Sequence, residues 1–154
     1  MNKKVFKLLL LGIIFLSASC VQMMNSSSGP LPPVKSADIY SYSENIFDYD
    51  MKVTNYSGGR KATEIRITPK NYNYISGQRP FKVYDHDGDG NFEWLRVYSE
   101  GKEFNYRILP NGFGYEFNGL SPVSNHILFE NLGHAQRARE IVPKKGSRKR
   151  IHLS

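Results

Sequence analysis

The sequence predicts a mainly β protein: a small antiparallel β-meander or sandwich-like domain with a short C-terminal helix. The chain contains 10 Tyr and 9 Phe residues, and ring side chains pack well on the pleated surface of a sheet. Residues 81–118 also place apolar side chains at alternate positions, the period that puts them on one face of a strand. The turns between these apolar runs are short, which favours antiparallel neighbours.

Residues 1–19 have the pattern of an export signal. Three lysines, Lys3, Lys4 and Lys7, precede an apolar run over residues 8–16, and small residues follow it. The apolar run is shorter than the roughly 20 residues that span a bilayer, so it favours a cleaved signal over a retained transmembrane helix.

Cys20 is the only cysteine in the chain. A lone cysteine cannot form an internal disulfide, and directly after a signal its simplest explanation is lipid attachment. Residues 16–20 resemble a bacterial lipobox, although Ser17 stands where a larger apolar residue is commoner. The resemblance implies that Cys20 carries the lipid, palmitate included, and begins the mature protein. Ordinary signal cleavage after small residues is the alternative.

The residue after this cysteine bears on localisation. In the resembled lipoproteins an Asp at this position retains the product at the inner membrane, whereas this chain has Val21. The resemblance therefore implies display on the outer membrane or the cell surface, with the periplasmic face as an alternative. Residues 20–36 are polar, contain Pro and show no periodicity, so we expect a flexible membrane tether.

The remaining length suits one β-rich domain over residues 37–133. Its first expected strands are residues 38–43 and 51–56, which alternate weakly. Residues 62–68 alternate clearly, and Pro69 should end that strand because proline has no N–H to donate.

Residues 81–118 predict four strands of a meander. The apolar sets of the four strands are Phe81 and Val83; Leu95 and Val97; Phe104, Tyr106 and Ile108; and Phe113, Tyr115 and Phe117. Trp94 and Tyr98 belong to the opposite face. They form either a binding patch or a structural layer under flanking segments, and in so small a domain we expect them to be covered.

The first connection of this meander, residues 85–93, is rich in carboxylates. Aspartates at alternate positions can turn toward one point, Gly90 permits a sharp turn, and without a cation the negative charges repel one another. We expect a bound Ca²⁺, with ligands from Asp85, Asp87, Asp89, Asn91 and Glu93. The alternative is an acidic solvated turn, because Asp-Gly pairs are hairpin signals by themselves.

The same loop resembles two calcium families. It matches the first half of an EF-hand or dockerin loop, but Arg96 stands where those loops have their last acidic ligand. It is more similar to the D-x-D-x-D-G-x-x-[DE] loops that join two strands in integrin-type propeller repeats and many secreted bacterial domains. That resemblance implies four carboxylate ligands and a carbonyl ligand from Asn91. Mg²⁺ is disfavoured by its octahedral demand, and Zn²⁺ by the lack of Cys and of converging His.

Residues 122–132 fit either a short helix or a strand, and the sequence leaves both open. On a helix, His126, Glu130 and His134 would lie along one side, the pattern of a metal or acid–base group. Gly133 is expected to end the helix between the last two, so we assign no such role.

Residues 134–154 are expected to form a short helix that stops at Pro143, followed by a basic tail. The signal and residues 134–154 together carry more positive charge than the net +7, because the body of the chain between them has a slight excess of acidic residues. Such a tail can meet anionic lipids, phosphate-rich envelope polymers or extracellular nucleic acid, and the alternative is a merely solvated segment. Its lack of interleaved aromatic residues argues against a dedicated nucleic-acid surface.

These features predict a calcium-binding envelope lipoprotein that acts as a structural or binding module, with an anionic envelope polymer or a protein as partner. No nucleophile–base pair stands out, so we expect no enzyme. One alternative is a small subunit of an envelope assembly of the secretion or conjugation type. The other is a glycan-active enzyme that uses carboxylates such as Glu64, Glu103 or Glu116.

Overall fold

A computed structural model describes residues 30–71, 79–110, 115–117 and 123–152. The chain divides into two compact units, Met1–Leu31 and Pro32–Ser154. The second unit contains every strand described below and the helix. Within the described part of the chain, no helical segment combines the length and apolar character needed to cross a bilayer.

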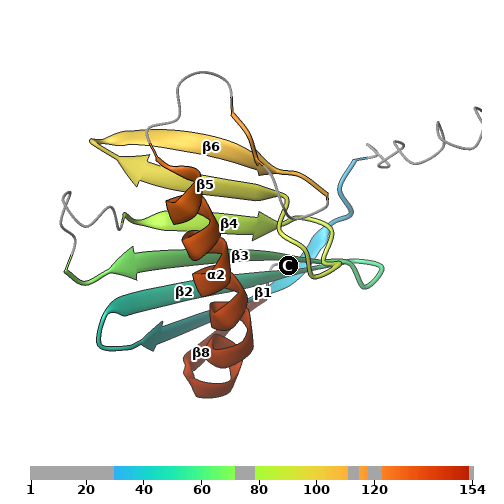
Figure 1. Cartoon of the computed structure of the whole chain (residues 1–154). Helices are drawn as coiled ribbons and strands as arrows, with labels where there is room; N and C mark the ends of the chain where they lie inside the picture. Colours follow the sequence, from blue (N-terminus) through green and yellow to red (C-terminus); the bar gives the residue numbers. More distant parts are fainter. Residues whose placement is uncertain (1–29, 72–78, 111–114, 118–122, 153–154) are drawn as a thin grey trace, which may run out of the picture. The chain divides into compact units, whose positions relative to one another are not determined.

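The second unit is one eight-stranded antiparallel sheet with a single helix, α2 (Asn125–Lys145), lying across it (Figure 1). The strands are β1 (Val34–Ser43), β2 (Phe47–Tyr56), β3 (Lys61–Pro69), β4 (Phe81–Asp85), β5 (Trp94–Ser99), β6 (Lys102–Ile108), β7 (Tyr115–Glu116) and β8 (Ser147–His152). Their order in the sheet is β7-β6-β5-β4-β3-β2-β1-β8. The mainly β prediction is confirmed, and the layer that covers the sheet is a helix rather than a second sheet.

The predicted meander is present, because β4, β5, β6 and β7 pair in sequence order. Residues 113, 114 and 118 of its fourth expected strand lie outside the described residues. The earlier strands are longer than predicted. β1 begins at Val34, inside the expected tether, and β2 begins at Phe47, where the burial alternation of that strand already starts.

The core follows from the strand register. One row of paired residues runs across six neighbouring strands: Tyr40, Met51, Ile65, Val83, Leu95 and Tyr106. Because side chains alternate along a strand, this row and the rows two residues away from it face the same side of the sheet. Helix α2 covers that side with Leu128, Leu132, Ala135, Ala138 and Val142, all buried. The two alanines are small enough to let the helix backbone approach the sheet closely.

The helix is longer than the sequence predicts. It begins after Ser124, passes through Gly133 and Pro143, and ends at Lys145. Residues 122–132, left open between helix and strand, are therefore helical from Asn125 onward. A single glycine inside a helix costs only about 1 kcal/mol, which the buried face of α2 offsets. The prediction that Gly133 ends a short helix is wrong.

The basic C-terminal segment is a strand rather than a solvated tail. β8 pairs with β1 from Ser36–His152 to Ser41–Ser147. Arg148 and Arg150 both reach the buried carboxylate of Asp38, at 3.0 and 2.7 Å. In the sequence this segment resembles a tail because its alternate positions carry basic rather than apolar side chains. In the folded sheet, the basic side chains Arg148 and Arg150 pair with one buried aspartate of β1.

The sheet face opposite the helix is only partly covered in the described residues. Trp94, which we expected to be covered, is 40% exposed, whereas Tyr98 on the same strand is half-buried. The carboxylates considered for glycan chemistry also lie on strands of this sheet, each in an ion pair with a neighbouring strand. The pairs are Glu64–Lys82, Glu103–Arg96 and Glu116–Arg107.

Candidate metal centre

The acidic loop between β4 and β5 brings the four predicted carboxylates together. Each of Asp85, Asp87, Asp89 and Glu93 offers one oxygen, and these four oxygens all lie within 4.8 Å of one another. Asp85 is the last residue of β4 and is 2% exposed, while Asp87 and Asp89 are exposed. Within the described residues, no second group of His, Cys, Asp and Glu side chains converges in this way.

The loop backbone folds around these side chains. Asp85 accepts hydrogen bonds from the N–H groups of Gly88 and Gly90, at 2.6 and 3.2 Å. At the other end of the loop, Glu93 accepts one from the His86 N–H at 2.7 Å. These bonds hold the carboxylates in one cluster because they fix where the loop begins, turns and ends.

Asn91 takes part in the cluster through hydrogen bonds to Asp89. Its backbone N–H donates to Asp89 Oδ1 at 2.7 Å, and its side-chain amide donates to Oδ2 at 2.9 Å. These two donors lower the pKa of Asp89. The role of the Asn91 carbonyl as a metal ligand stays a prediction.

Gly88 fixes where the loop lies on the sheet. Its φ angle is +78°, and a Cβ at this position would stand 2.5 Å from the carbonyl oxygen of Lys61 at the start of β3. Both the backbone angle and the close approach require glycine. The loop therefore rests directly on the start of β3.

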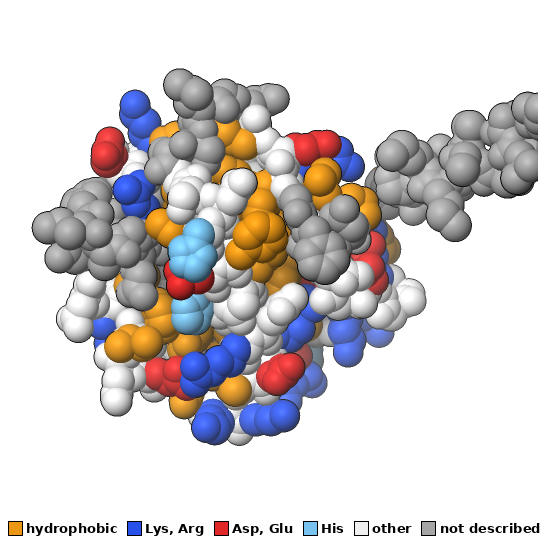
Figure 2. All heavy atoms as spheres, in the orientation of Figure 1, with side chains coloured by type: hydrophobic (Ala, Val, Ile, Leu, Met, Phe, Trp, Pro, Cys, Tyr) orange, Lys and Arg blue, Asp and Glu red, His pale blue; other side chains and the backbone are white. Residues whose placement is uncertain are grey.

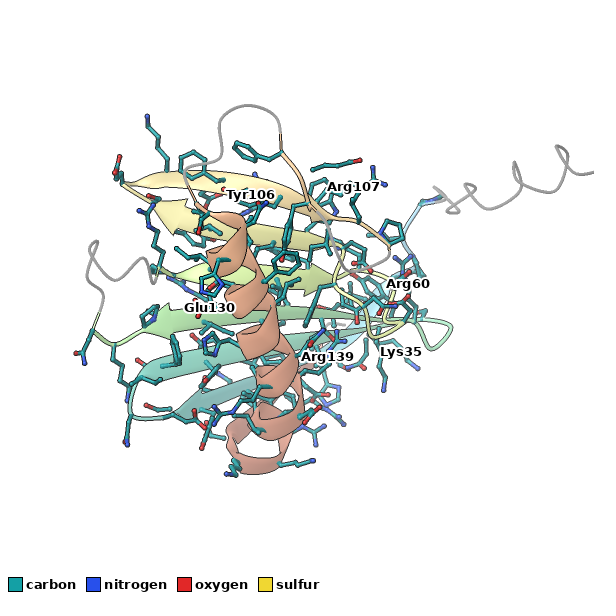
Figure 3. All side chains as sticks on the ribbon, in the orientation of Figure 1. Lys35, Arg60, Tyr106, Arg107, Glu130 and Arg139 are labelled. Carbon is teal, nitrogen blue, oxygen red and sulfur yellow. The ribbon has the colours of Figure 1, made fainter. Side chains whose placement is uncertain are left out.

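Two arginines far away in the sequence hold the loop from outside (Figure 3). Arg60, on the β2–β3 turn, donates to the His86 carbonyl at 2.8 Å from Nη2 and 3.3 Å from Nε. Arg139, on α2, forms an ion pair with Asp85 at 2.5 Å and donates to the Gly90 carbonyl. The Arg139 guanidinium also lies 4.3 Å from the centre of the Phe92 ring.

No local pattern marks Arg139 as part of this site. Its partner Asp85 is 54 positions away, and local spacing cannot identify such a contact. In the sequence Arg139 belongs to the basic C-terminal charge, whereas the register of α2 on the sheet turns it toward the loop. Its single positive charge cannot balance the negative charge of all four carboxylates.

Glu93 experiences the uncompensated negative charge directly. Burial raises its pKa, the hydrogen bond from the His86 N–H opposes that shift, and repulsion from Asp87 and Asp85 raises the pKa further. A cation placed among the four carboxylates would relieve this repulsion. The cluster consists of oxygen donors, which are the ligands that hard cations prefer.

Because α2 continues through Gly133, His126, Glu130 and His134 lie along one side of the same helix. Figure 2 shows two histidines flanking an acidic side chain on the helix-bearing face. His126 Nε2 lies 3.6 Å from Glu130 Oε1. His134 instead packs on Phe47, with ring centres 4.7 Å apart, and its burial lowers its pKa. The three do not form one of the converging groups among the described residues.

The fold and the site define a mainly β protein, one eight-stranded antiparallel sheet with a C-terminal helix and an acidic cluster that can hold a metal ion. Comparison with protein-family models, curated proteins and solved structures finds no match to this chain.

Proposed function

We propose that this protein is a calcium-binding envelope lipoprotein whose β domain acts as a structural or binding module. The observation that carries the proposal is the convergence of four carboxylate oxygens within 4.8 Å on a loop between two strands. In the proposed bound state, Ca²⁺ replaces the repulsion between these groups with attraction and fixes the loop on the sheet.

Calcium suits this site better than magnesium does. The ligands come from a turn held by hydrogen bonds to its own backbone, and calcium accepts six to eight oxygens in irregular geometry. Magnesium requires a nearly octahedral shell and releases its waters reluctantly. In an external medium, a dissociation constant of about 10⁻⁴ to 10⁻³ M is sufficient for a structural site.

Thermal unfolding with and without a chelator tests the ion. Calcium should raise the melting temperature more than magnesium does, because a ligand that binds only the folded state stabilises it by mass action. Asp87→Ala and Asp89→Ala should remove the calcium response. His86→Ala should keep it, since this residue contributes its backbone N–H to the loop.

Calorimetry with calcium can contradict the same proposal. If calcium produces neither binding heat nor a shift in the melting temperature, residues 85–93 are an acidic hairpin turn, held by its own hydrogen bonds and by the two arginines.

The membrane anchor rests on Cys20 and the segment before it. Mass spectrometry of the mature protein should show a lipid-bearing N-terminal cysteine. Cys20→Ala should leave the membrane fraction. A Cys20→Ala protein that fractionates with membranes as the parent does would remove the lipid anchor from the proposal.

A further inference from the structure

A cationic pocket of about 600 Å³ lies at the end of the sheet where the acidic loop touches β3. Four of its lining side chains are basic: Lys35, Arg60, Lys61 and His152. In the described part of the chain, no acidic side chain lines this pocket. Figure 3 shows Lys35 and Arg60 at the same end of the sheet.

The strand register builds part of the pocket wall. His152, Ser36, Asn55 and Lys61 are paired in one row across β8, β1, β2 and β3. The Asn55 amide donates to the Ser36 hydroxyl at 3.2 Å, which orients both polar groups. Basic and hydrogen-bonding groups from four strands therefore line one hollow, in positions that the sheet sets.

Arg60 is held in place before any ligand arrives. Its Nε and Nη2 donate to the His86 carbonyl, and its guanidinium lies 5.9 Å from the centre of the Tyr56 ring. A guanidinium carries more N–H donors than one carbonyl uses. Arg60 can hold the loop and still offer a donor and a positive charge to the pocket.

A buried acid close to the pocket is already compensated. Asp38 lies two residues along β1 from Ser36, and both Arg148 and Arg150 bind it. Their two positive charges exceed its single negative charge. Asp38 therefore does not cancel the positive potential of the pocket.

We propose that the cationic pocket binds a phosphate group. Lys35, Arg60 and Lys61 carry three positive charges, more than a ligand with a single carboxylate could neutralise. Phosphate oxygens also accept hydrogen bonds from several directions. The Ser36 hydroxyl and the Asn55 amide add uncharged donors or acceptors beside them. The phosphate can be free in solution or part of a phospholipid headgroup, since both present the same chemistry.

The acidic loop should control this affinity, an effect that rests on the calcium site proposed above. The loop contacts Arg60 through the His86 carbonyl and touches the Lys61 backbone at Gly88, so when empty it places excess negative charge beside both residues. Charges interact over roughly 8–10 Å at physiological salt. Bound calcium cancels much of that charge. Calcium should therefore tighten phosphate binding, and phosphate should tighten calcium binding by the same factor.

Titration of the full chain with inorganic phosphate at low ionic strength tests the pocket. We expect saturable binding heat that weakens as salt rises. Lys35→Gln and Lys61→Gln should each weaken binding by about two- to fivefold, the range for one exposed charge. Lys102→Gln is the matched control, because it removes an exposed lysine from β6, outside the pocket.

The pocket proposal is overturned by a titration without saturable heat. It is equally overturned if Lys102→Gln weakens binding as much as Lys61→Gln does, since the effect is then one of net charge. The melting temperature of each variant, measured beside the titration, shows that the fold is retained.

Phosphatidylcholine vesicles with and without phosphatidylglycerol distinguish the two phosphate sources. Retention that requires phosphatidylglycerol and falls in Lys61→Gln assigns the phosphate to a headgroup. Binding heat with inorganic phosphate, together with equal retention on both kinds of vesicle, assigns the phosphate to a soluble ligand. Repeating the phosphate titration with calcium below the precipitation limit tests the coupling. Phosphate binding that calcium leaves unchanged would contradict the coupling and leave the pocket in place, whereas calorimetry with calcium alone tests the metal proposal separately.

Discussion

The carboxylate of Asp85 and the guanidinium of Arg139 form an ion pair at 2.5 Å that joins the acidic loop to helix α2. The Asp85 side chain is 3% exposed and the Arg139 side chain 24% exposed. Removing one partner of such a pair leaves the other charge largely desolvated. The loop and the helix are therefore energetically linked.

The first prediction concerns this link. Without calcium, Arg139→Met should destabilise the protein by about 2–3 kcal/mol, because Asp85 loses its cation. Calcium should restore much of the loss, since it supplies positive charge to the same carboxylate cluster. Chemical unfolding in chelator and in calcium measures both effects.

Arg137→Met is the control for that experiment. Arg137 also pairs with an acid, Glu44 at 3.0 Å, but its side chain is 59% exposed. Exposed pairs contribute about 0–1 kcal/mol. Equal losses in the two variants, or a loss in Arg139→Met that calcium leaves unchanged, would show that Arg139 does not act through the loop.

The second prediction separates backbone strain from close packing in the loop. Gly88 and Gly58 have similar φ angles, +78° and +85°, but only at Gly88 would an added Cβ meet a backbone oxygen, at 2.5 Å. Both alanine substitutions should cost about 1–2 kcal/mol for the left-handed backbone. Gly88→Ala should cost more and weaken the calcium response, because the loop must move off β3. Unfolding free energies of the two variants, with and without calcium, decide it.

The sequence could predict the sheet and the acidic loop because both depend on local patterns. Apolar alternation located β3 to β6 closely, and the spacing of Asp85, Asp87, Asp89 and Glu93 is visible in nine consecutive positions. Strand β8 was not predicted, because its side chains are charged and its partner in β1 lies more than a hundred positions away. Only the folded sheet brings them together.

The continuity of α2 was missed for a different physical reason. Gly133 and Pro143 are helix breakers in isolated segments. In the folded protein, Ala135, Ala138 and Val142 are completely buried against the sheet, and that packing exceeds the local penalty. Arg139 reaches the loop only because this helix continues past Gly133.

The third prediction concerns pH. Hydrogen bonds from Arg150 lower the pKa of Asp38, burial opposes the shift, and hydrogen bonding and attraction from Arg148 lower the pKa further. A lowered pKa means that the folded state favours the carboxylate. Its stabilisation is therefore present above the unfolded value of 3.8 and is lost as pH falls through that value toward the folded pKa.

Asp38→Asn should accordingly lower the free energy of unfolding at neutral pH by about 1 kcal/mol, which corresponds to a melting temperature several degrees lower. The difference from the parent should shrink in acid. Glu93 acts in the opposite sense, because its pKa is raised, but it contributes equally to both proteins. A difference in melting temperature that stays constant from neutral pH to below pH 3.8 would contradict the assigned ion pairs.

The fourth prediction is that deletion of residues 147–154 destabilises the protein by at least about 3 kcal/mol. The deletion removes the backbone pairing of β8 with β1, takes both arginines from Asp38, and exposes the edge of β1. Lys149→Gln is the control, because it removes an exposed charge of the same strand that alternates away from Asp38. Thermal unfolding should show a lower melting temperature for the deletion variant, and light scattering should show that it aggregates. Lys149→Gln should show neither change. A deleted protein that melts like the parent would mean that the segment is a solvated tail.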